Sequence, residues 1–170
     1  MSSSDLRAPG LLYVMLDIDG VLCPKQALEP APGQQTWARG WATDFDPGCL
    51  RYLTDAVLSH AHARIVISSN WRKREDLSTL QIRFGAALGE RVIGVTPVLE
   101  STTRHYRLNE VLLYFKQQGL TAPPWVALED DFEHFPTDAP VICTGTETGI
   151  TAADGERLSR WFASGGANPP

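Results

Sequence analysis

The sequence predicts an α/β fold, a Rossmann-like three-layer α/β/α sandwich with a mostly parallel sheet. Short apolar runs alternate along the chain with longer segments of helical period, which is the pattern of strands and helices taking turns. The short runs are apolar on both faces, as strands covered by helices on both sides must be. The 170 residues suit one hydrophobic core. We assign one domain to 11–163, with flexible ends at 1–10 and 164–170.

Short runs rich in β-branched residues and bounded by turn residues are the expected strands. In chain order they are LLYVMLD (11–17), ARIVISS (63–69), RVIGVTP (91–97), WVALED (125–130) and APVICT (139–144). Each is too short for a helix of ordinary length. We therefore expect each run to contribute one strand to a single sheet.

Longer segments between these runs carry apolar residues at helical spacing. They are 46–61, 74–88, 107–119 and 151–163. Gly119 marks the end of the third segment. Thr151 is a plausible N-cap for the fourth, although Gly155 weakens that helix.

Residues 23–46 break the alternation. They contain several prolines and glycines, Trp37 and Trp41, and no clear period. A segment of this composition predicts a long loop or short hairpin, a flap over the mouth of the site. It is too short for an independent domain.

The composition limits the function classes. A formal net charge of −5 argues against non-specific nucleic-acid binding by the whole surface. Cys23, Cys49 and Cys143 are widely spaced and lack a CxxC pair, so we predict buried free thiols in a reducing cytoplasm. The apolar run 11–16 is short and ends at Asp17, and no stretch approaches the length of a membrane span. The sequence leaves the oligomeric state open.

Polar residues stand where the predicted strands end, and ligands of parallel sheets bind at that edge. Asp17 and Asp19 share a side of the extended chain, and Gly20 allows a sharp turn after them. Asp130 or Asp131 adds a third carboxylate after a later strand. Close carboxylates favour a cation between them, and such oxygen ligands suit Mg²⁺.

Each of these motifs also has an ordinary structural reading. A DxDG sequence is common in turns, and the acids after the later strand fit a solvated strand end. In the SSN sequence at 68–70, Ser69 or Asn70 could cap the helix that follows. The three motifs at strand ends of one sheet favour a functional site.

In this order and on these elements, YVMLDIDGVL, RIVISSN, an arginine before a helix, and WVALEDD resemble the haloacid dehalogenase (HAD) superfamily of phosphohydrolases. The resemblance covers about 11–131. VISSNWR, VIGVTP, RLNEV and TGTETGITAADGERL resemble more closely the small HAD domain of Swiss Army Knife RNA repair proteins, and extend the similarity over almost the whole chain.

The resemblance implies an HAD-like fold and roles for the first two motifs. Asp17 would attack phosphorus and become an aspartyl-phosphate. Asp19 would protonate the leaving oxygen and then activate water. Ser69 would hold a phosphate oxygen beside Asn70, because the family's hydroxyl usually stands just before a small polar residue; Ser68 is the alternative.

The resemblance also implies a cation and a metal site. The family places a lysine or arginine before a helix to neutralise the phosphoryl charge. Here Arg107 fits best and Arg104 is the alternative. The ordinary structural reading of either one is a solvated arginine at a helix start. The implied Mg²⁺ ligands are Asp17, Asp130 and the backbone carbonyl of Asp19, with Asp131 a further ligand or a neighbour of one.

Many HAD enzymes carry a cap domain, and this chain has no segment long enough for a large one. An open site would admit a nucleotide or polynucleotide phosphate end. Bases could stack on Trp37, Trp41 or Trp71, and the basic run 72–74 could meet a phosphate backbone. Ordinary packing of these tryptophans is the stronger alternative.

The predicted function is therefore that of a Mg²⁺-dependent phosphohydrolase. The alternative is a catalytically silent HAD-like binding or regulatory module, which the missing lysine of the third motif favours. A receiver-like signalling domain fits less well, because the middle strand ends in serines and the last in Thr144. His105 and His134 are interpreted as surface or packing residues.

Overall fold

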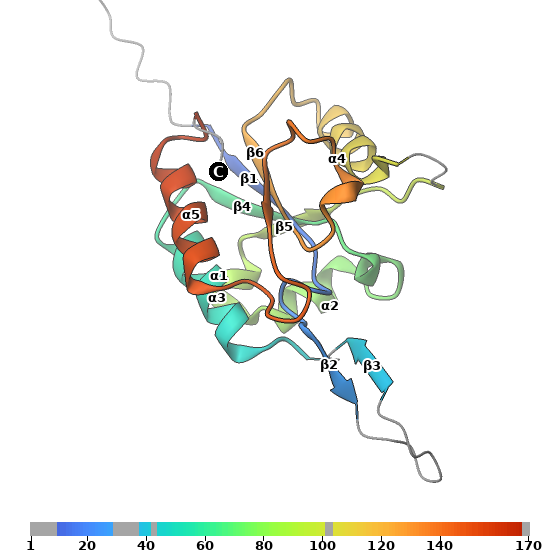
Figure 1. Cartoon of the computed structure of the whole chain (residues 1–170). Helices are drawn as coiled ribbons and strands as arrows, with labels where there is room; N and C mark the ends of the chain where they lie inside the picture. The colour runs from blue at the N-terminus through green and yellow to red at the C-terminus, as the bar shows by residue number, and fades with distance from the viewer. Residues whose placement is uncertain (1–9, 29–37, 42–43, 101–103, 168–170) are drawn as a thin grey trace, which may run out of the picture.

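The computed structural model describes residues 10–28, 38–41, 44–100 and 104–167. Five parallel strands form the main sheet in the order β5-β4-β1-β6-β7 (Figure 1). They are β1 (Leu12–Leu16), β4 (Ala63–Ile67), β5 (Val92–Val95), β6 (Trp125–Glu129) and β7 (Val141–Cys143). All pairings in this sheet are parallel, which confirms the predicted fold class.

The register of the three central strands brings their carboxyl ends to one level. Leu16 of β1 pairs with Ile67 of β4 and with Leu128 of β6. The next residue, Asp17, donates its backbone N–H to Leu128 at 3.0 Å. The polar residues that follow β1, β4 and β6 therefore meet at one edge of the sheet.

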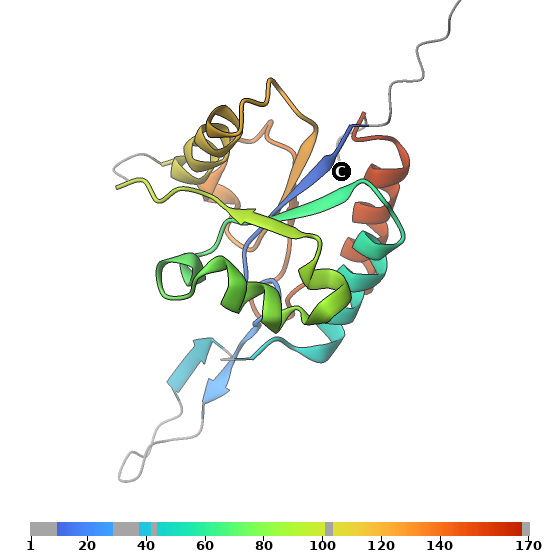
Figure 2. The same ribbon diagram turned by 180° about the vertical axis from the view of Figure 1, so that it is seen from behind.

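Helices cover both faces of the sheet (Figures 1 and 2). Leu53, Leu80, Leu88 and Leu158, from four helices, join the core on one face, and Val111 and Phe115 join the core on the other. The helices of the first face are α1 (Pro47–Leu58), α2 (Leu77–Arg83), α3 (Gly85–Gly89) and α5 (Ala152–Ala163), and the second face carries α4 (Tyr106–Gln117).

Helix boundaries follow the expected capping residues. Thr151 caps α5 in a capping box with Asp154, and Gly119 follows α4 with φ of 67°. Gly155 lies inside α5, where an added Cβ would stand 3.3 Å from the carbonyl oxygen of Tyr52. The glycine that weakens α5 as an isolated helix thus allows α1 to approach closely.

The single helix expected at 74–88 is two helices, α2 and α3. The break falls at Gly85, whose φ of 76° lies in the left-handed region that ends a helix. Apolar spacing continues across the break, so periodicity alone did not reveal it.

The segment 23–46 was predicted to be a long loop or a short hairpin, and it contains a short antiparallel hairpin. Strand β2 (Lys25–Leu28) pairs with β3 (Ala38–Trp41). The hairpin extends away from the domain (Figures 1 and 2). Its base is held where Lys25 donates its backbone N–H to Thr146 at 2.8 Å. Trp37 lies outside the described residues.

The three thiols are free. Cys23 and Cys49 are buried, as expected, whereas Cys143 is exposed at the end of the edge strand β7. Burial raises the pKa of Cys23 to about 12 and that of Cys49 to about 11. No helix in the described part of the chain is long and apolar enough to cross a membrane.

Candidate active site

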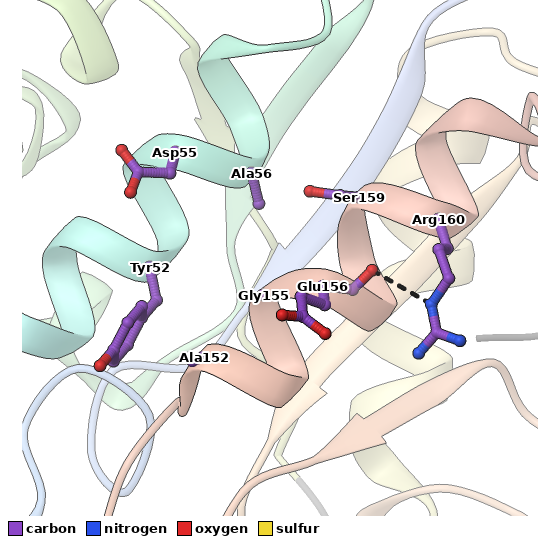
Figure 3. A pocket seen from close by; sticks show the side chains of 8 residues that line it. All are labelled: Tyr52, Asp55, Ala56, Ala152, Gly155, Glu156, Ser159 and Arg160. Atoms are coloured by element: carbon purple, nitrogen blue, oxygen red, sulfur yellow. Dashed lines mark hydrogen bonds between the residues drawn. The ribbon is translucent and has the colours of Figure 1, made fainter.

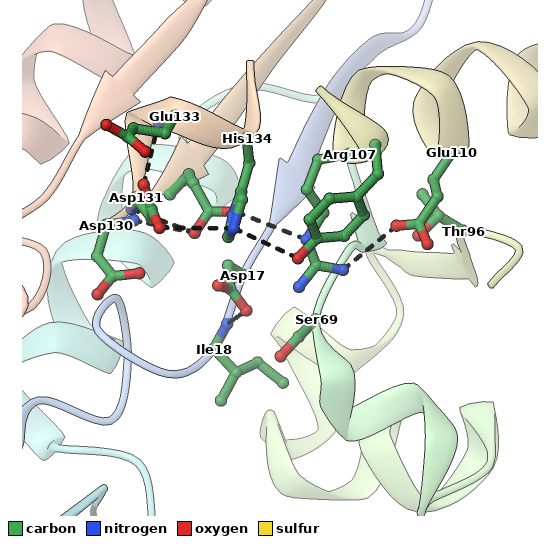
Figure 4. Close-up of polar contacts among 12 residues, drawn as sticks. Asp17, Ile18, Ser69, Thr96, Arg107, Glu110, Asp130, Asp131, Glu133 and His134 are labelled. Carbon is green, nitrogen blue, oxygen red and sulfur yellow. Dashed lines mark hydrogen bonds and ion pairs between the residues drawn. The ribbon is translucent and has the colours of Figure 1, made fainter. Parts of the chain in front are cut away.

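A cluster of three carboxylates lies at the carboxyl edge of the sheet. Asp17 follows β1, Glu129 ends β6, and Asp130 follows it; one carboxylate oxygen from each lies within 4.8 Å of the others. Asp17 is 7% exposed and Glu129 is 2% exposed. Figure 4 shows Asp17 and Asp130 on neighbouring loops at this edge.

Glu129 is the site residue that sequence reasoning missed. The sequence predicted Asp17, Asp19, Asp130 and Asp131 as the acids of the site. A signal was present, because Glu129 is an acid at the end of an otherwise apolar strand, and buried carboxylates are rare without a partner. Its Oε1 accepts hydrogen bonds from the backbone N–H groups of Asp130 at 3.2 Å and Asp131 at 3.4 Å.

Gly20 is required where β1 turns away from the cluster. Its φ is 78°, which confirms the expected sharp turn. An added Cβ at Gly20 would lie 2.2 Å from Oδ2 of Asp130. A larger residue at this position would therefore displace one of the three carboxylates.

The electrostatics of the cluster favour a bound cation. Burial, and then the negative charge of Glu129, raise the pKa of Asp17 well above its usual value. Burial raises the pKa of Glu129 to about 7. Two buried carboxylates with raised pKa values resist carrying two charges unless a cation lies between them. This oxygen-only donor set fits Mg²⁺.

These pKa values predict how pH affects metal-free protein. The folded state binds the Glu129 proton more tightly than the unfolded state does, so its free energy of unfolding should fall as pH rises from about 4.5 to about 7. The loss for this group should be about 3 kcal/mol. Denaturant unfolding at several pH values, with chelator present, measures it.

Glu129→Gln should flatten this pH dependence, because the neutral amide does not titrate. Glu133→Gln is the matched control, since the Glu133 side chain is 63% exposed. Equal pH dependence in the wild-type and Glu129→Gln proteins would show that Glu129 does not carry the effect.

Ser69 faces Asp17 (Figure 4), whereas Ser68 Oγ is buried and makes no hydrogen bond. A hydrogen bond from Ser69 offsets part of the burial effect on the pKa of Asp17. Ser69 Oγ also accepts the backbone N–H of Trp71 at 3.4 Å, so it caps the 3₁₀ helix η1 (Asn70–Lys73). The capping role and the place at the site coexist. Asn70 is exposed.

Arg107, not Arg104, lies at the site. Arg107 is the second residue of α4 and is 2% exposed. Its Nε lies 3.8 Å from Glu129 Oε2, and this nitrogen makes no hydrogen bond. Figure 4 shows its guanidinium between Asp17, Ser69 and Glu110. The Arg104 side chain is 72% exposed and lies 3.9 Å from Glu133.

Asp19 is oriented by Trp71 and its side chain lies outside the carboxylate cluster. The indole Nε1 of Trp71 donates to Asp19 Oδ1 at 3.0 Å. Burial raises the pKa of Asp19, while the Trp71 hydrogen bond and the charge of Arg74 offset part of that effect. Because an indole N–H only donates, Oδ1 accepts from it, and Oδ2 is the oxygen left to carry a proton.

The structure corrects the expectation that Trp71 stacks nucleic-acid bases. Trp71 is 5% exposed and packs against Phe45, with ring centroids 5.8 Å apart. Arg72 is corrected too: its side chain is 1% exposed and pairs with Glu110 at 2.7 Å. Neither side chain is accessible to a substrate, because Trp71 packs in the core and Arg72 makes buried polar contacts.

Asp131 and the two histidines lie beside the site. Asp131 accepts the N–H of Glu133 at 3.0 Å and so caps the 3₁₀ helix η2 (Phe132–His134), away from the carboxylate cluster. His134 packs edge-on against Tyr106, with Nδ1 3.8 Å from Glu129 Oε2. His105 contacts the Glu133 carbonyl at 3.2 Å. The interpretation of both as packing or surface histidines agrees with these contacts.

A groove lies away from this edge of the sheet. It encloses about 620 Å³ between α1 and α5, lined by Tyr52, Gly155 and Glu156 among others (Figure 3). The strand-end acids do not line it. This groove is therefore separate from the carboxylate cluster.

Comparison with known proteins relates the chain to a family. The family model of the HAD domain in Swiss Army Knife RNA repair proteins matches residues 13–154. No curated protein and no solved structure matches the chain. The matched range runs from β1 into α5 and includes all the residues that meet at the carboxyl edge.

Proposed function

This chain belongs to the family of HAD domains in Swiss Army Knife RNA repair proteins, and from that membership we propose that it is a Mg²⁺-dependent phosphohydrolase acting through an aspartyl-phosphate on Asp17. The observation that carries the proposal is one constellation. The Ser69 hydroxyl and the Arg107 guanidinium, whose Nε makes no hydrogen bond, converge on the buried Asp17 of the carboxylate cluster.

Each side chain has a place in two successive displacements. The Asp17 carboxylate attacks phosphorus while the bond to the leaving oxygen breaks. Ser69 and Arg107 bind the phosphoryl oxygens. Asp19 gives its Oδ2 proton to the leaving oxygen, then takes a proton from the water that releases phosphate and regenerates Asp17.

Asp17, Glu129 and Asp130 are the side chains that would hold Mg²⁺, and the backbone carbonyl of Asp19 is a further proposed ligand. The bound ion supplies positive charge that offsets the repulsion between the substrate phosphate and the nucleophile. Glu129, from the end of β6, is added to the predicted Mg²⁺ ligands. The Asp130 side chain packs directly over Gly20.

A phosphate-release screen tests the proposal. Nucleotides, sugar phosphates and phosphorylated oligonucleotides are incubated with the protein and Mg²⁺. Release from at least one class, at a rate that scales with enzyme concentration, is the expected result. Release from none would favour the catalytically silent HAD-like module.

Arg107→Ala should lower kcat about 10²- to 10³-fold, because the buried guanidinium is the cation nearest the developing phosphoryl charge. Arg104→Ala is the matched control and should leave kcat within about twofold, since an exposed, weakly paired arginine contributes little. Steady-state kinetics measure both. The reverse ranking would move the role to Arg104.

The absence of a cap bears on substrate size. Within the described ranges no further domain is inserted beside the site. We propose that a nucleotide or nucleic-acid phosphate end is the substrate. Trp41, in β3, and Trp37, outside the described residues, remain the proposed stacking residues. Lys73 and Arg74 are the exposed cations of the basic run.

Arg74 is the best placed of these cations. Its guanidinium carbon lies 5.6 Å from the centre of the Trp71 ring, whose Nε1 contacts Asp19. Arg83 also stacks on this ring, but two 2.7 Å hydrogen bonds engage it with Glu75. The charge of Arg74 therefore stands beside the group that would protonate the leaving oxygen.

A phosphorylated oligonucleotide should outcompete a sugar phosphate in kcat/KM, with an advantage that shrinks as salt rises. Arg74→Gln should reduce the slope of log kcat/KM against log salt by about 0.7, as for one lost phosphate contact. Arg51→Gln is the control, because Arg51 stacks on Tyr52 on α1 at 5.1 Å. A sugar phosphate preferred at all salt concentrations would contradict the nucleic-acid substrate.

A further inference from the structure

Arg72 is a buried arginine, and each of its three guanidinium nitrogens has a partner in the protein. Its Nε donates to the carbonyl of Thr96 at 2.9 Å, its Nη1 donates to the carbonyl of Ser69, and its Nη2 donates to the carbonyl of Pro97 at 3.3 Å. Its Nη2 also pairs with Glu110 Oε2 at 2.7 Å. These contacts join the loop after β4, the end of β5 and helix α4.

Glu110 connects Arg72 to Arg107. The same Oε2 that pairs with Arg72 lies 3.3 Å from Nη1 of Arg107, and Oε1 accepts the backbone N–H of Leu99 at 3.1 Å. The Glu110 side chain is 2% exposed. Both of its oxygens are thus occupied inside the protein, and neither is available to a substrate.

The position of Arg107 depends on this balance of charges. Glu110 attracts its guanidinium from one side, and Glu129 and Asp17 attract it from the other. Without Glu110, the remaining buried attraction would draw Arg107 onto the carboxylates of the cluster. An arginine drawn onto these carboxylates would have fewer N–H donors left for the oxygens of a phosphate.

We propose that Glu110 and Arg72 are positioning residues that hold Arg107 and Ser69 in the geometry needed to bind phosphate. The inference rests on the proposed function, since Arg107 and Ser69 are its phosphate-binding groups. Arg72 holds Ser69 by donating a hydrogen bond to the backbone carbonyl of Ser69, and Glu110 holds Arg107 through their ion pair. Neither positioning residue touches the substrate.

Arg72→Lys is the first test, with inorganic phosphate in the presence of Mg²⁺ as the probe in calorimetry. Lysine keeps the positive charge beside Glu110 but lacks the planar set of donors that reaches Ser69, Thr96 and Pro97. Phosphate affinity should fall at least about tenfold. In turnover, kcat/KM should fall through a raised KM as well as a lowered kcat, because Arg107 and Ser69 bind the phosphoryl oxygens in the ground state and in the transition state.

Arg91→Lys is the matched control. Nη1 of Arg91 donates to the carbonyls of His60, Ala61 and Ala63 at the opposite edge of the sheet. Arg91→Lys also removes hydrogen bonds from an arginine to backbone carbonyls, and it should keep wild-type phosphate affinity. A similar loss of phosphate affinity in both variants would show a general stability effect and overturn the proposal.

A double-mutant cycle separates positioning from packing. Glu110→Gln should weaken phosphate binding at least about tenfold in the wild-type background and less than about twofold in the Arg107→Ala background. Equal losses in both backgrounds would overturn the proposal. If Glu110→Gln does not fold, the comparison of Arg72→Lys with Arg91→Lys decides it. If the wild-type protein releases phosphate and the folded Arg72→Lys and Glu110→Gln variants keep its phosphate affinity, the positioning role alone is overturned. If the wild-type protein neither binds nor releases phosphate, the proposed function is overturned too.

Discussion

Asp17→Asn is expected to lower kcat at least about 10⁴-fold and to leave the fold intact. The amide has the size of the carboxylate but cannot attack phosphorus. Asp17 is buried beside Glu129, and burial together with that charge raises its pKa. Removing its charge should therefore leave the thermal midpoint of metal-free protein at neutral pH unchanged or higher. Phosphate release and thermal unfolding on the same preparation measure both effects.

Asp131→Asn is the matched control for that experiment. Asp131 lies two residues after Glu129, the last residue of β6, but its side chain caps η2. Asparagine can accept the same backbone hydrogen bond. Its kcat should stay within about threefold of wild type. Near-normal turnover by Asp17→Asn would mean that another group is the nucleophile.

Removal of Mg²⁺ is the second large effect. Excess chelator should lower phosphate release at least about 10³-fold, because the ion is expected to supply several kcal/mol of charge stabilisation. Added Mg²⁺ should restore the rate and raise the thermal midpoint, since the ion binds the folded carboxylate cluster. Full activity in chelator would contradict the proposed mechanism.

Glu129→Gln tests whether the cluster is the metal site. The variant should need at least about tenfold more Mg²⁺ for half-maximal rate, because one anionic ligand becomes neutral. Glu133→Gln, on the exposed side of η2, should keep the wild-type requirement. An unchanged requirement in Glu129→Gln would place the ion elsewhere.

The sequence by itself determined the fold class and the edge of the sheet where the site lies. Short apolar runs and helical periods depend on local spacing, and parallel strands covered on both faces follow from their alternation. The turn at Gly20 and the cap at Thr151 were readable for the same reason, since each reflects the backbone conformation of a few neighbouring residues. The helix break at Gly85 was not readable from the sequence, because a glycine within a helical period can continue a helix or end it.

Only the tertiary structure decided which of several similar residues belongs to the site. Ser69 and Arg107 face Asp17 because the register of β4 and the docking of α4 aim them there, while Ser68 and Arg104 differ from them little in local sequence. Trp71 and Arg72 sit in a basic, aromatic stretch typical of a binding surface, yet long-range contacts with Phe45 and Glu110 bury them. Glu129 joins the acids because β6 lies beside β1. Local spacing does not specify such distant pairings, because they depend on how the elements pack.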